Sequence, residues 1–227
     1  MTNKVLLVIG GSSGIGSAIM KEAQKNDYQV IATSRQGGMD SIAMDVTDNA
    51  SVQNGIRTAL QRVDKIDAVL FAPAITDKAL IHAADIEEWQ AVYDVNILGA
   101  LRVTKALLPH FMKKRYGAFV YLSSTAAIRG SVGAAAYASS KAALNSLAKG
   151  VSKEYGRFNI RAFTIMPGYV NGGMLKDMDE QRIQEISKSI ALKRFAHVNE
   201  VAQFTVASLN IPYINGTSLS IDGGTDA

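Results

Sequence analysis

The chain has 227 residues, of which 48% are hydrophobic and 19% charged, which suits one α/β domain with a sizeable core and leaves too little chain for a second large domain. The net charge is only +4, and the one tight basic run, Lys113-Lys114-Arg115, ends a helical pattern where cations complement the helix dipole, so we expect no nucleic-acid partner. The absence of cysteine excludes disulfides and thiolate metal sites, and we expect no metal.

The first apolar run, Val5–Ile9, is too short for the core of a signal peptide and leads directly into glycines. No other stretch approaches the roughly 20 apolar residues that a membrane-spanning helix needs. We therefore expect a cytoplasmic protein with no membrane partner.

Short runs rich in apolar and β-branched residues alternate with longer helical patterns along the chain. This alternation is typical of repeated βαβ units, which form a parallel sheet with helices on both faces. No linker or internal repeat interrupts it, so we predict a single α/β domain over residues 1–227 with a doubly wound, seven-stranded parallel sheet. The predicted strands are Lys4–Ile9, Gln29–Thr33, Ser41–Met44, Ala68–Ala72, Ala118–Leu122, Ile160–Met166 and Ser218–Ile221.

A glycine-rich segment follows the first strand directly and opens a helix. Glycines at this point permit a tight turn and the close approach of a pyrophosphate, whose charge is met by the amides at the helix N-terminus. A plain turn between strand and helix is the alternative, but the strand before and the helix after favour dinucleotide binding. The predicted contacts of this segment are Gly10, Ser12, Ser13, Gly14, Ile15 and Gly16.

The second strand ends in Ser34-Arg35, where an enzyme that uses NAD would carry an acid for the adenosine ribose. The guanidinium of Arg35 can bind a 2′-phosphate with a planar, permanently charged fork, whereas an acid there would repel it. This favours NADP(H) as the cofactor, with Ser34 and Arg35 as ligands. Asp40 keeps NAD(H) open as the less favoured alternative, and Arg35 could also be an ordinary surface arginine.

Asp45 and Val46 end the third strand. The carboxylate of Asp45 can accept a hydrogen bond from the adenine amine, with Val46 beside the ring, so we predict that both contact the dinucleotide. Asp45 could instead start the next helix, although Thr47 and Asp48 already suit that role.

Two long helices are predicted in the middle of the chain. The first begins at Asp85, which can accept from the amide three residues on while Glu88 reaches back, a capping box, and it runs to about Arg115. The second covers Gly133–Tyr155, and Gly156 is placed to end it in a left-handed conformation.

The second predicted helix carries Tyr137 and Lys141, whose i, i+4 spacing puts a phenol and an ammonium on one face. A phenol has a pKa of about 10, and a cation within about 4–6 Å can lower a pKa by about 1–3 units. We therefore predict Tyr137 as the proton-transferring residue, although a tyrosine and a lysine on a helix can also have no function. Ser124 follows the fifth strand, at the sheet edge where α/β proteins bind ligands.

Together these residues resemble the short-chain dehydrogenase/reductase family, in particular its 3-oxoacyl-(acyl-carrier-protein) reductase-like members, over nearly the whole chain. The match comprises the glycine loop, Asp45-Val46, Asn96, Ser124, Tyr137, Lys141, Pro167-Gly168 and the terminal Ile221-Asp222-Gly223-Gly224. The resemblance implies a Rossmann fold, and a homotetramer or homodimer formed through the two long helices.

The resemblance also implies a role for each catalytic residue. Ser124 would hydrogen-bond a substrate carbonyl, and Tyr137 would protonate its oxygen as hydride arrives from the nicotinamide. Lys141 would hold the nicotinamide ribose and lower the pKa of Tyr137, while Asn96 would place a water in a proton relay, unless it is an ordinary buried amide. Further cofactor contacts are implied at Ala72, Ala74, Pro167, Gly168 and Val170, beside Tyr137 and Lys141 themselves.

Three positions depart from the family pattern: Ile9 replaces a threonine, Phe71-Ala72-Pro73-Ala74 replaces Asn-Asn-Ala-Gly, and Gly172 replaces a threonine. In the family the first two segments share a polar contact, so both sides have become apolar together here, and restoring the threonine at Ile9 alone should destabilise the fold. The short distance from Arg35 to Asp45 also leaves no room for the usual helix between the second and third strands.

The substrate pocket is expected from the segments near Ile75–Ile81, Thr125–Ala136 and Tyr169–Ile190, with His82 at most a rim residue. Tyr169, Met174, Leu175 and Met178 suit a flexible apolar lid, although ordinary helix packing explains the methionines equally well. Two functions follow. The favoured one is NADP(H)-dependent interconversion of a small-molecule carbonyl and a secondary alcohol, and the alternative is a dinucleotide-binding sensor or scaffold with little turnover.

Overall fold

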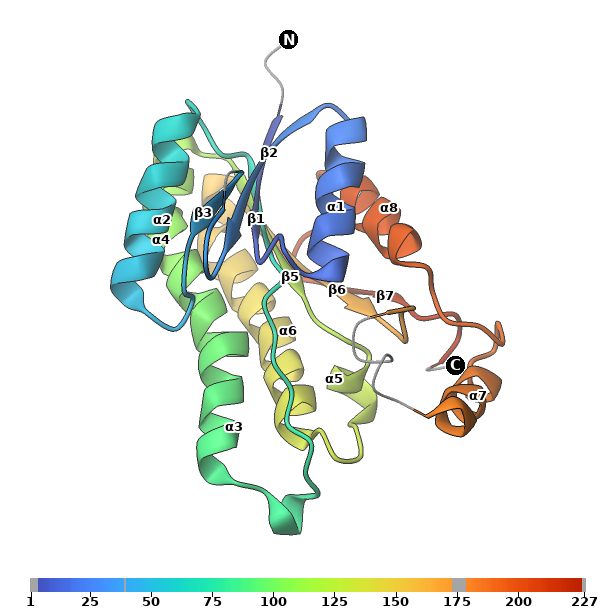
Figure 1. Ribbon diagram of the computed structural model, residues 1–227. Helices are drawn as coiled ribbons and strands as arrows, with labels where there is room; N and C mark the ends of the chain where they lie inside the picture. Colours follow the sequence, from blue (N-terminus) through green and yellow to red (C-terminus); the bar gives the residue numbers. More distant parts are fainter. Residues whose placement is uncertain (1–3, 39, 173–178, 226–227) are drawn as a thin grey trace.

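The computed structural model describes residues 4–38, 40–172 and 179–225. Its centre is a parallel seven-stranded sheet in the order β3-β2-β1-β4-β5-β6-β7, with helices on both faces, as predicted (Figure 1). The strands are β1 Lys4–Ile9, β2 Tyr28–Ser34, β3 Ser41–Ala43, β4 Ala68–Phe71, β5 Gly117–Leu122, β6 Ile160–Pro167 and β7 Ser218–Ile221. The order reverses between β1 and β4, and this switch point is where such sheets bind ligands.

The central strands β1, β4, β5 and β6 are almost entirely buried, because both faces of the sheet are covered there. In β1, Leu7 and Ile9 point into the core beneath α2, α4 and α6, whereas Leu6 and Val8 point into the core beneath α1 and α8. The larger helices are α1 Gly14–Lys25, α2 Asn49–Arg62, α4 Gly99–Lys114, α6 Ala135–Tyr155 and α8 Val198–Leu209.

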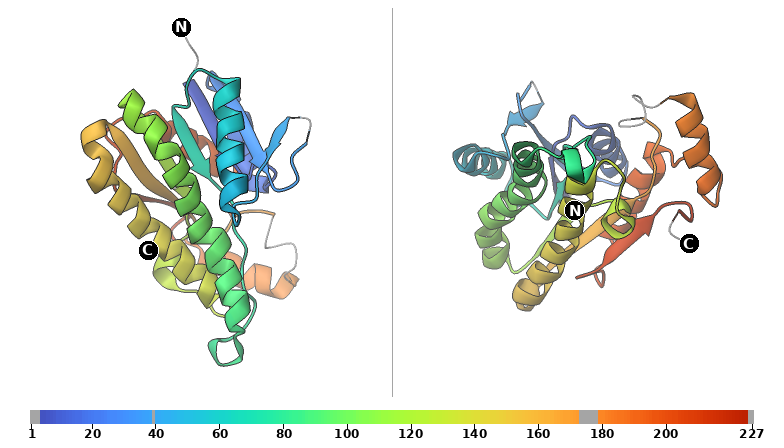
Figure 2. Two further views of the ribbon diagram at one scale, coloured as in Figure 1. Left: turned by 90° about the vertical axis from the view of Figure 1, so that its left-hand side faces the viewer. Right: turned by 90° about the horizontal axis from the view of Figure 1, so that it is seen from below.

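The shorter helices gather at the carboxyl edge of the sheet, which is the edge formed by the C-terminal ends of the strands (Figures 1 and 2). They are α3 Ile86–Tyr93, α5 Ala126–Arg129 and α7 Glu180–Ser189, with a 3₁₀ turn at Ile81–Ala83. Together with the first turns of α6, α3 extends past this edge. Among the residues the structure describes, no helix is both long and apolar enough to span a bilayer.

The first long helix differs from its prediction in two respects. It is not continuous, because a π-helical turn at Asp94–Leu98 separates α3 from α4. Its start is also different: the carboxylate of Asp85 accepts from the amide of Glu87 at 2.7 Å rather than from the third amide, and no return bond from Glu88 is present among the described residues. The π turn has a structural consequence, because it buries the side chain of Asn96.

The predicted left-handed ending at Gly156 is wrong. Gly156 has a right-handed φ of −56° and begins a 3₁₀ turn, Gly156–Phe158, that continues α6. Asn159, with φ 58°, makes the left-handed turn instead, a conformation that asparagine tolerates better than most residues. The added turn lets Phe158 pack against the core before the chain enters β6.

At the ends of the first strands, two buried apolar side chains lie beside a buried hydroxyl. Ile9 lies in register between Thr33 on β2 and Phe71 on β4, so the three side chains share one face of the sheet. Ile9 and Phe71 are each 1% exposed. The hydroxyl of Thr33 is fully buried and finds no hydrogen-bond partner among the described residues.

We expect Ile9→Thr to lower the free energy of unfolding by about 1–3 kcal/mol, because it removes buried methylenes and buries a second hydroxyl beside Phe71. The matched change Thr33→Val, which removes the orphan hydroxyl at nearly constant shape, should raise that free energy by about 1 kcal/mol. Urea denaturation measures both. A hydrogen bond between the new threonine and Thr33 would offset part of the loss, but an Ile9→Thr protein as stable as the wild type would contradict this account.

The connection from β2 to β3 contains no helix, as predicted. The turn is held by a hydrogen bond from the amide of Gly37 to the carbonyl of Ser34. Gly37 and Gly38 both have positive φ, at 71° and 152°, which explains the glycine pair at this point. The last residues of β2, Ala32–Ser34, pair with β3, and Arg35 follows directly after them.

Candidate active site

The glycine loop turns from β1 into α1 at the switch point of the sheet. Gly10 takes a positive φ of 77°, and a Cβ on Gly16 would lie only 2.6 Å from the carbonyl oxygen of Gly10, so both positions require glycine. The hydroxyl of Ser13 accepts from the amide of Gly16 at 3.0 Å and begins the helix. Pro73 packs against the outer side of Gly10.

The same loop leaves space and free donors for a phosphate group. A Cβ on Gly14 would meet nothing within 4 Å, and Ser12, Ser13 and Gly14 are exposed. No protein group in the described part of the chain accepts from the amides of Gly14 and Ile15, which belong to the first turn of α1 and have no partner within the helix. Unused amides at a helix N-terminus fit the pyrophosphate of a dinucleotide.

Arg35 is exposed at the end of β2 and makes no hydrogen bond or ion pair with any residue that the structure describes. Its guanidinium is therefore available for a phosphate. The hydroxyl of Ser34 is differently placed, because it already donates to the carbonyl of Gly37 and accepts from Ser41, each at 3.1 Å. The side chain of Ser34 thus holds the β2–β3 turn and has no proton left for a ligand.

Asp45 does not start α2, because Asp48 caps that helix by accepting from its second amide at 2.8 Å. One carboxylate oxygen of Asp45 accepts from both the amide and the hydroxyl of Thr47, at 2.9 and 2.7 Å. These hydrogen bonds, together with the positive charges of two arginines, hold the pKa of Asp45 below its usual value. Val46 is buried beside Gly99.

Tyr137 and Lys141 lie on one face of α6, as their spacing predicts, and this face is directed to the end of β5. The ammonium nitrogen of Lys141 lies 5.5 Å from the centre of the Tyr137 ring and donates to the carbonyl of Leu122 at 2.6 Å. The phenol of Tyr137 is hydrogen-bonded to the side chain of Ser124, just beyond the same strand. The structure thus brings together three of the four predicted catalytic side chains.

Burial controls the charges of this group. Lys141 is 1% exposed and has no carboxylate partner among the described residues, and burial lowers its pKa to about 7. Burial also raises the pKa of Tyr137, while the hydrogen bond from Ser124 opposes the rise. The predicted lowering of the tyrosine pKa by Lys141 is therefore wrong for this structure, because burial is the largest cause and raises the pKa.

The buried ammonium of Lys141 also tests whether a dinucleotide fits. An ammonium has three donors, and within the described residues only the carbonyl of Leu122 accepts from it. The remaining donors point to a polar group supplied from outside the chain, such as the hydroxyls of a nicotinamide ribose. The amides of Gly14 and Ile15 fit a pyrophosphate, and the ammonium of Lys141 fits a ribose. These donors therefore fit a nicotinamide dinucleotide.

The side chain of Asn96, the fourth predicted catalytic residue, makes three hydrogen bonds. Its amide pairs with Ile75 by donating to the carbonyl and accepting from the N–H, both at 2.9 Å. It also donates to the hydroxyl of Ser140 at 2.9 Å. Both N–H groups of the side chain are thus occupied, so a water in a proton relay would have to bind the backbone of Asn96 or the second lone pair of its side-chain oxygen.

The remaining predicted cofactor contacts lie along the carboxyl edge. Ala72 is buried at the end of β4, and Ala74 is exposed two residues later. Pro167 ends β6, and Gly168 comes so close to the C-terminal segment that a Cβ would lie 2.9 Å from its backbone. Val170, further along the same loop, is half-buried. All five lie on the carboxyl side of β4 or β6, as a nicotinamide site requires.

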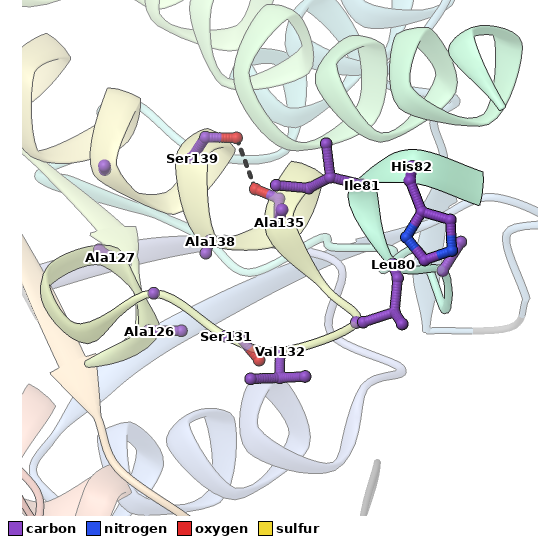
Figure 3. A pocket seen from close by; sticks show the side chains of 14 residues that line it. Leu80, Ile81, His82, Ala126, Ala127, Ser131, Val132, Ala135, Ala138 and Ser139 are labelled. Carbon is purple, nitrogen blue, oxygen red and sulfur yellow. Dashed lines mark hydrogen bonds between the residues drawn. The ribbon is translucent and has the colours of Figure 1, made fainter. Parts of the chain in front are cut away.

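An apolar cavity of about 880 Å³ lies beside α6 (Figure 3). Two of the three segments predicted for the substrate pocket line it, whereas neither Tyr137 nor any described residue of Tyr169–Ile190 does. The lining residues are Ala79, Leu80, Ile81, His82, Ala126, Ala127, Gly130, Ser131, Val132, Gly133, Ala135, Ala138, Ser139 and Ala142. The cavity therefore lies on a different face of α6 from the candidate active site.

The predicted lid is only partly described. Tyr169 packs edge to face against Phe195, and the guanidinium of Arg129 lies 5.3 Å from its ring centre. Met174, Leu175 and Met178 lie outside the described residues. Gly172 has a positive φ of 94°, so the threonine that the family carries there would be strained at this position.

Sequence reasoning missed three polar side chains that hold α6 in place. Asp77 accepts from the first amides of the helix, Ser140 donates to the carbonyl of Tyr137, and Ser123 donates to the carbonyl of Lys141. The position of Ser140 inside the tyrosine–lysine motif was a usable signal. The sequence contains no comparable signal for Asp77, because its hydrogen-bond partners are 59 and 60 residues away.

Known proteins match this chain over nearly its whole length. A family model described as enoyl-(acyl carrier protein) reductase matches residues 10–226. The 3-oxoacyl-(acyl-carrier-protein) reductase FabG of Thermotoga maritima is 30% identical over 241 residues, covering 99% of this chain and 98% of the relative. Carbonyl reductase family member 4 of Xenopus laevis is 29% identical, with 98% of each chain covered.

A solved structure is equally similar in fold. Ligand-free aldohexose dehydrogenase of Thermoplasma acidophilum matches with a TM-score of 0.90 and 27% identity, covering 99% of this chain and 94% of that one. The family match, the full-length relatives and the fold all confirm the resemblance seen in the sequence. The chain belongs to the short-chain dehydrogenase/reductase family of oxidoreductases.

Proposed function

We propose that the protein is an NADP(H)-dependent oxidoreductase that interconverts a carbonyl and a secondary alcohol, with Tyr137 as general acid and base. One observation carries the proposal: the phenol of Tyr137 is hydrogen-bonded to Ser124 and lies beside the buried ammonium of Lys141, at the carboxyl edge of the sheet. A phenol and a hydroxyl lie together there, where one carbonyl oxygen can meet both, and the ammonium lies beside the phenol.

The chain supplies the proton and the orientation for the reaction. Bound NADPH supplies a hydride to the carbonyl carbon. Ser124 donates a hydrogen bond to the carbonyl oxygen, and Tyr137 transfers its phenolic proton to that oxygen as the π electrons of the carbonyl move onto it. The raised pKa of Tyr137 keeps the phenol protonated at neutral pH, which is the form that this transfer requires. In the reverse direction, the phenolate accepts the proton of the alcohol.

Residues from several elements are proposed to hold the whole length of the dinucleotide, from its adenine to its nicotinamide. The glycine loop and the first amides of α1 bind the pyrophosphate, Arg35 the 2′-phosphate, Asp45 and Val46 the adenine, and Lys141 the nicotinamide ribose. Ala72, Ala74, Pro167, Gly168 and Val170 form the wall beside the nicotinamide. We treat residues 1–227 as one dinucleotide-binding domain, and the cytoplasmic location and the homo-oligomer stay predictions.

The experiment is a screen of carbonyl compounds for oxidation of NADPH. The relatives suggest the panel: 3-oxoacyl thioesters, small ketones, and aldohexoses in the oxidative direction. We expect turnover with at least one class that disappears in Tyr137→Phe. The proposal fails if wild type and variant show equal rates with every compound that reacts.

The preference for NADP(H) is tested by Arg35→Glu. Replacing the guanidinium by a carboxylate removes a charge-assisted hydrogen bond of about 1.5–3 kcal/mol, so we expect NADPH to bind at least about tenfold more weakly. NADH, which has no 2′-phosphate, should bind about as well as before or better. Fluorescence titration with both dinucleotides measures this, and tighter binding of NADH than of NADPH by the wild type would contradict the proposal.

One feature favours a second function, dinucleotide binding as a sensor or scaffold with little turnover. Pro73 packs against Gly10 of the glycine loop and cannot donate a backbone hydrogen bond beside the nicotinamide. A protein of that kind would bind NADPH in the fluorescence titration and oxidise none with the whole panel. The two functions are therefore separated by the same pair of measurements.

A further inference from the structure

Asp77 lies in the loop after β4, and its carboxylate is held against the start of α6. One carboxylate oxygen accepts from the amide of Ala136 at 3.2 Å and the other from the amide of Tyr137 at 3.1 Å. The side chain is only 4% exposed. A carboxylate at this point accepts from amides that have no partner within the helix and interacts favourably with the positive end of the helix dipole.

The peptide groups on both sides of Tyr137 are therefore held by side chains, one from the loop after β4 and one from the next turn of α6. The amide of Tyr137 donates to Asp77, and its carbonyl accepts from the hydroxyl of Ser140 at 2.8 Å. Ser140 in turn accepts from the side-chain amide of Asn96 at 2.9 Å. The backbone of the proposed proton donor is thus clamped at its N–H and at its carbonyl.

Both of these contacts depend on the loop after β4: Asp77 belongs to it, and Ser140 is connected to it through Asn96. Asn96 is bound by the backbone of Ile75, two residues before Asp77. The loop is therefore hydrogen-bonded to the π turn through Ile75 and to α6 through Asp77. Further along the same segment, Ala79 forms a β-bridge with Ala134 just before α6 begins. The position of the first turn of α6 relative to β5 is consequently determined by the loop after β4.

We propose that Asp77 is a positioning residue that sets the phenol of Tyr137 at the distance from Ser124 and Lys141 that proton transfer requires. This inference rests on the proposed function, because it assigns Asp77 a part in the same reaction. Asp77 does not touch the reacting atoms, and it acts through the backbone of Tyr137. Small displacements matter for such a role, since an error of about 1 Å in a reacting group can lower a rate by about 10²-fold.

The test compares Asp77→Asn with a control of the same chemistry. Asparagine keeps one acceptor oxygen but turns an amino group toward the second amide, so one of the two hydrogen bonds is lost. The matched control is Asp67→Asn. Asp67 is 6% exposed and accepts from the amide of Val5 at 2.7 Å, at the opposite edge of the sheet. Both variants remove a buried carboxylate that binds backbone, but only one adjoins α6.

We expect Asp77→Asn to lower kcat at least tenfold, with the Kd for NADPH within twofold of wild type, at a temperature where circular dichroism shows a folded protein. Asp67→Asn should keep kcat within twofold. In a Tyr137→Phe background, Asp77→Asn should have no further effect on the residual rate, because the hydroxyl that it positions is gone. An unchanged kcat in Asp77→Asn, or the same fold loss with and without the tyrosine hydroxyl, would overturn the proposal.

A second readout needs no turnover. In cofactor-free protein labelled with fluorinated tyrosine, the resonance of Tyr137 is assigned by its absence in Tyr137→Phe, and we expect Asp77→Asn but not Asp67→Asn to shift it. An unshifted resonance overturns the positioning role even if no substrate is found. If Asp77→Asn does not fold, Asp77→Glu replaces it, since glutamate keeps the charge and both oxygens but displaces them by one methylene. Wild-type protein without tyrosine-dependent turnover would refute the proposed function alone.

Discussion

Replacing Tyr137 by phenylalanine is expected to lower kcat for carbonyl reduction by about 10²–10⁴-fold, the range that general acid catalysis contributes. The ring and its packing remain, so the Kd for NADPH should stay within about twofold. What is lost is the one proton that burial keeps on the phenol at neutral pH. Steady-state kinetics with NADPH and the best carbonyl substrate, together with fluorescence titration of the cofactor, measures both quantities.

The matched control is Tyr155→Phe, at the other end of the same helix. Tyr155 packs against the core beneath α6 and is far from the carboxyl edge. Its loss should leave kcat unchanged within about twofold. If Tyr137→Phe and Tyr155→Phe gave the same kcat, the phenol beside Ser124 would have no role in proton transfer.

The second large effect is expected from Lys141→Met. Methionine, which is also unbranched, can occupy the space of the buried lysine side chain. It removes the ammonium beside the Tyr137 ring and the donor to Leu122. We expect kcat/KM to fall by at least about 10²-fold, because both the cofactor ribose and the developing phenolate lose their cation. Lys149→Met, an exposed lysine two turns further along α6, is the control and should change kcat/KM by less than about twofold.

The same variant has an expected effect on stability in the cofactor-free protein. Burial lowers the pKa of Lys141 from 10.5 to about 7, so between these values the unfolded chain binds more protons than the folded one. The free energy of unfolding therefore rises with pH through this window, by at most about 1.4 kcal/mol per pH unit from this group. Below about pH 7 the penalty of the buried ammonium is fully present.

We accordingly expect Lys141→Met to be more stable than wild type near neutral pH and to lose this advantage as the pH approaches the ordinary lysine value. Urea denaturation of both proteins at several pH values gives their free energies of unfolding. Groups that titrate alike in both proteins do not contribute to the difference between these two free energies. A difference that does not change with pH would show that Lys141 is not desolvated in the folded protein.

The sheet could be predicted closely because its strands are short apolar runs separated by helical patterns, a signal that depends on sequence alone. The motif of Tyr137 and Lys141 was likewise local, since four residues on a helix return to the same face. The distance between the two groups was therefore predictable. The direction of the pKa shift of Tyr137 was not, because it depends on burial by segments remote in sequence.

The failures share this physical cause. The π turn that buries Asn96 is stabilised by the backbone of Ile75, from a loop 21 residues earlier, and no local pattern announces it. Gly156 carries the usual signal for a helix end, yet packing of Phe158 extends the helix past it. Two of the three expected pocket segments do meet, but Ala138 and Ala142 line their cavity on a different face of α6 from Tyr137.

The central claim is that this chain directs hydride and proton to the two ends of one carbonyl bond. Its most direct test uses NADPH carrying deuterium at the transferable position of the nicotinamide, with mass spectrometry of the alcohol product. We predict one deuterium on the carbinol carbon from a single face of the cofactor, formed by wild type and nearly absent in Tyr137→Phe. Product without deuterium, or equal labelling in both proteins, would contradict the account.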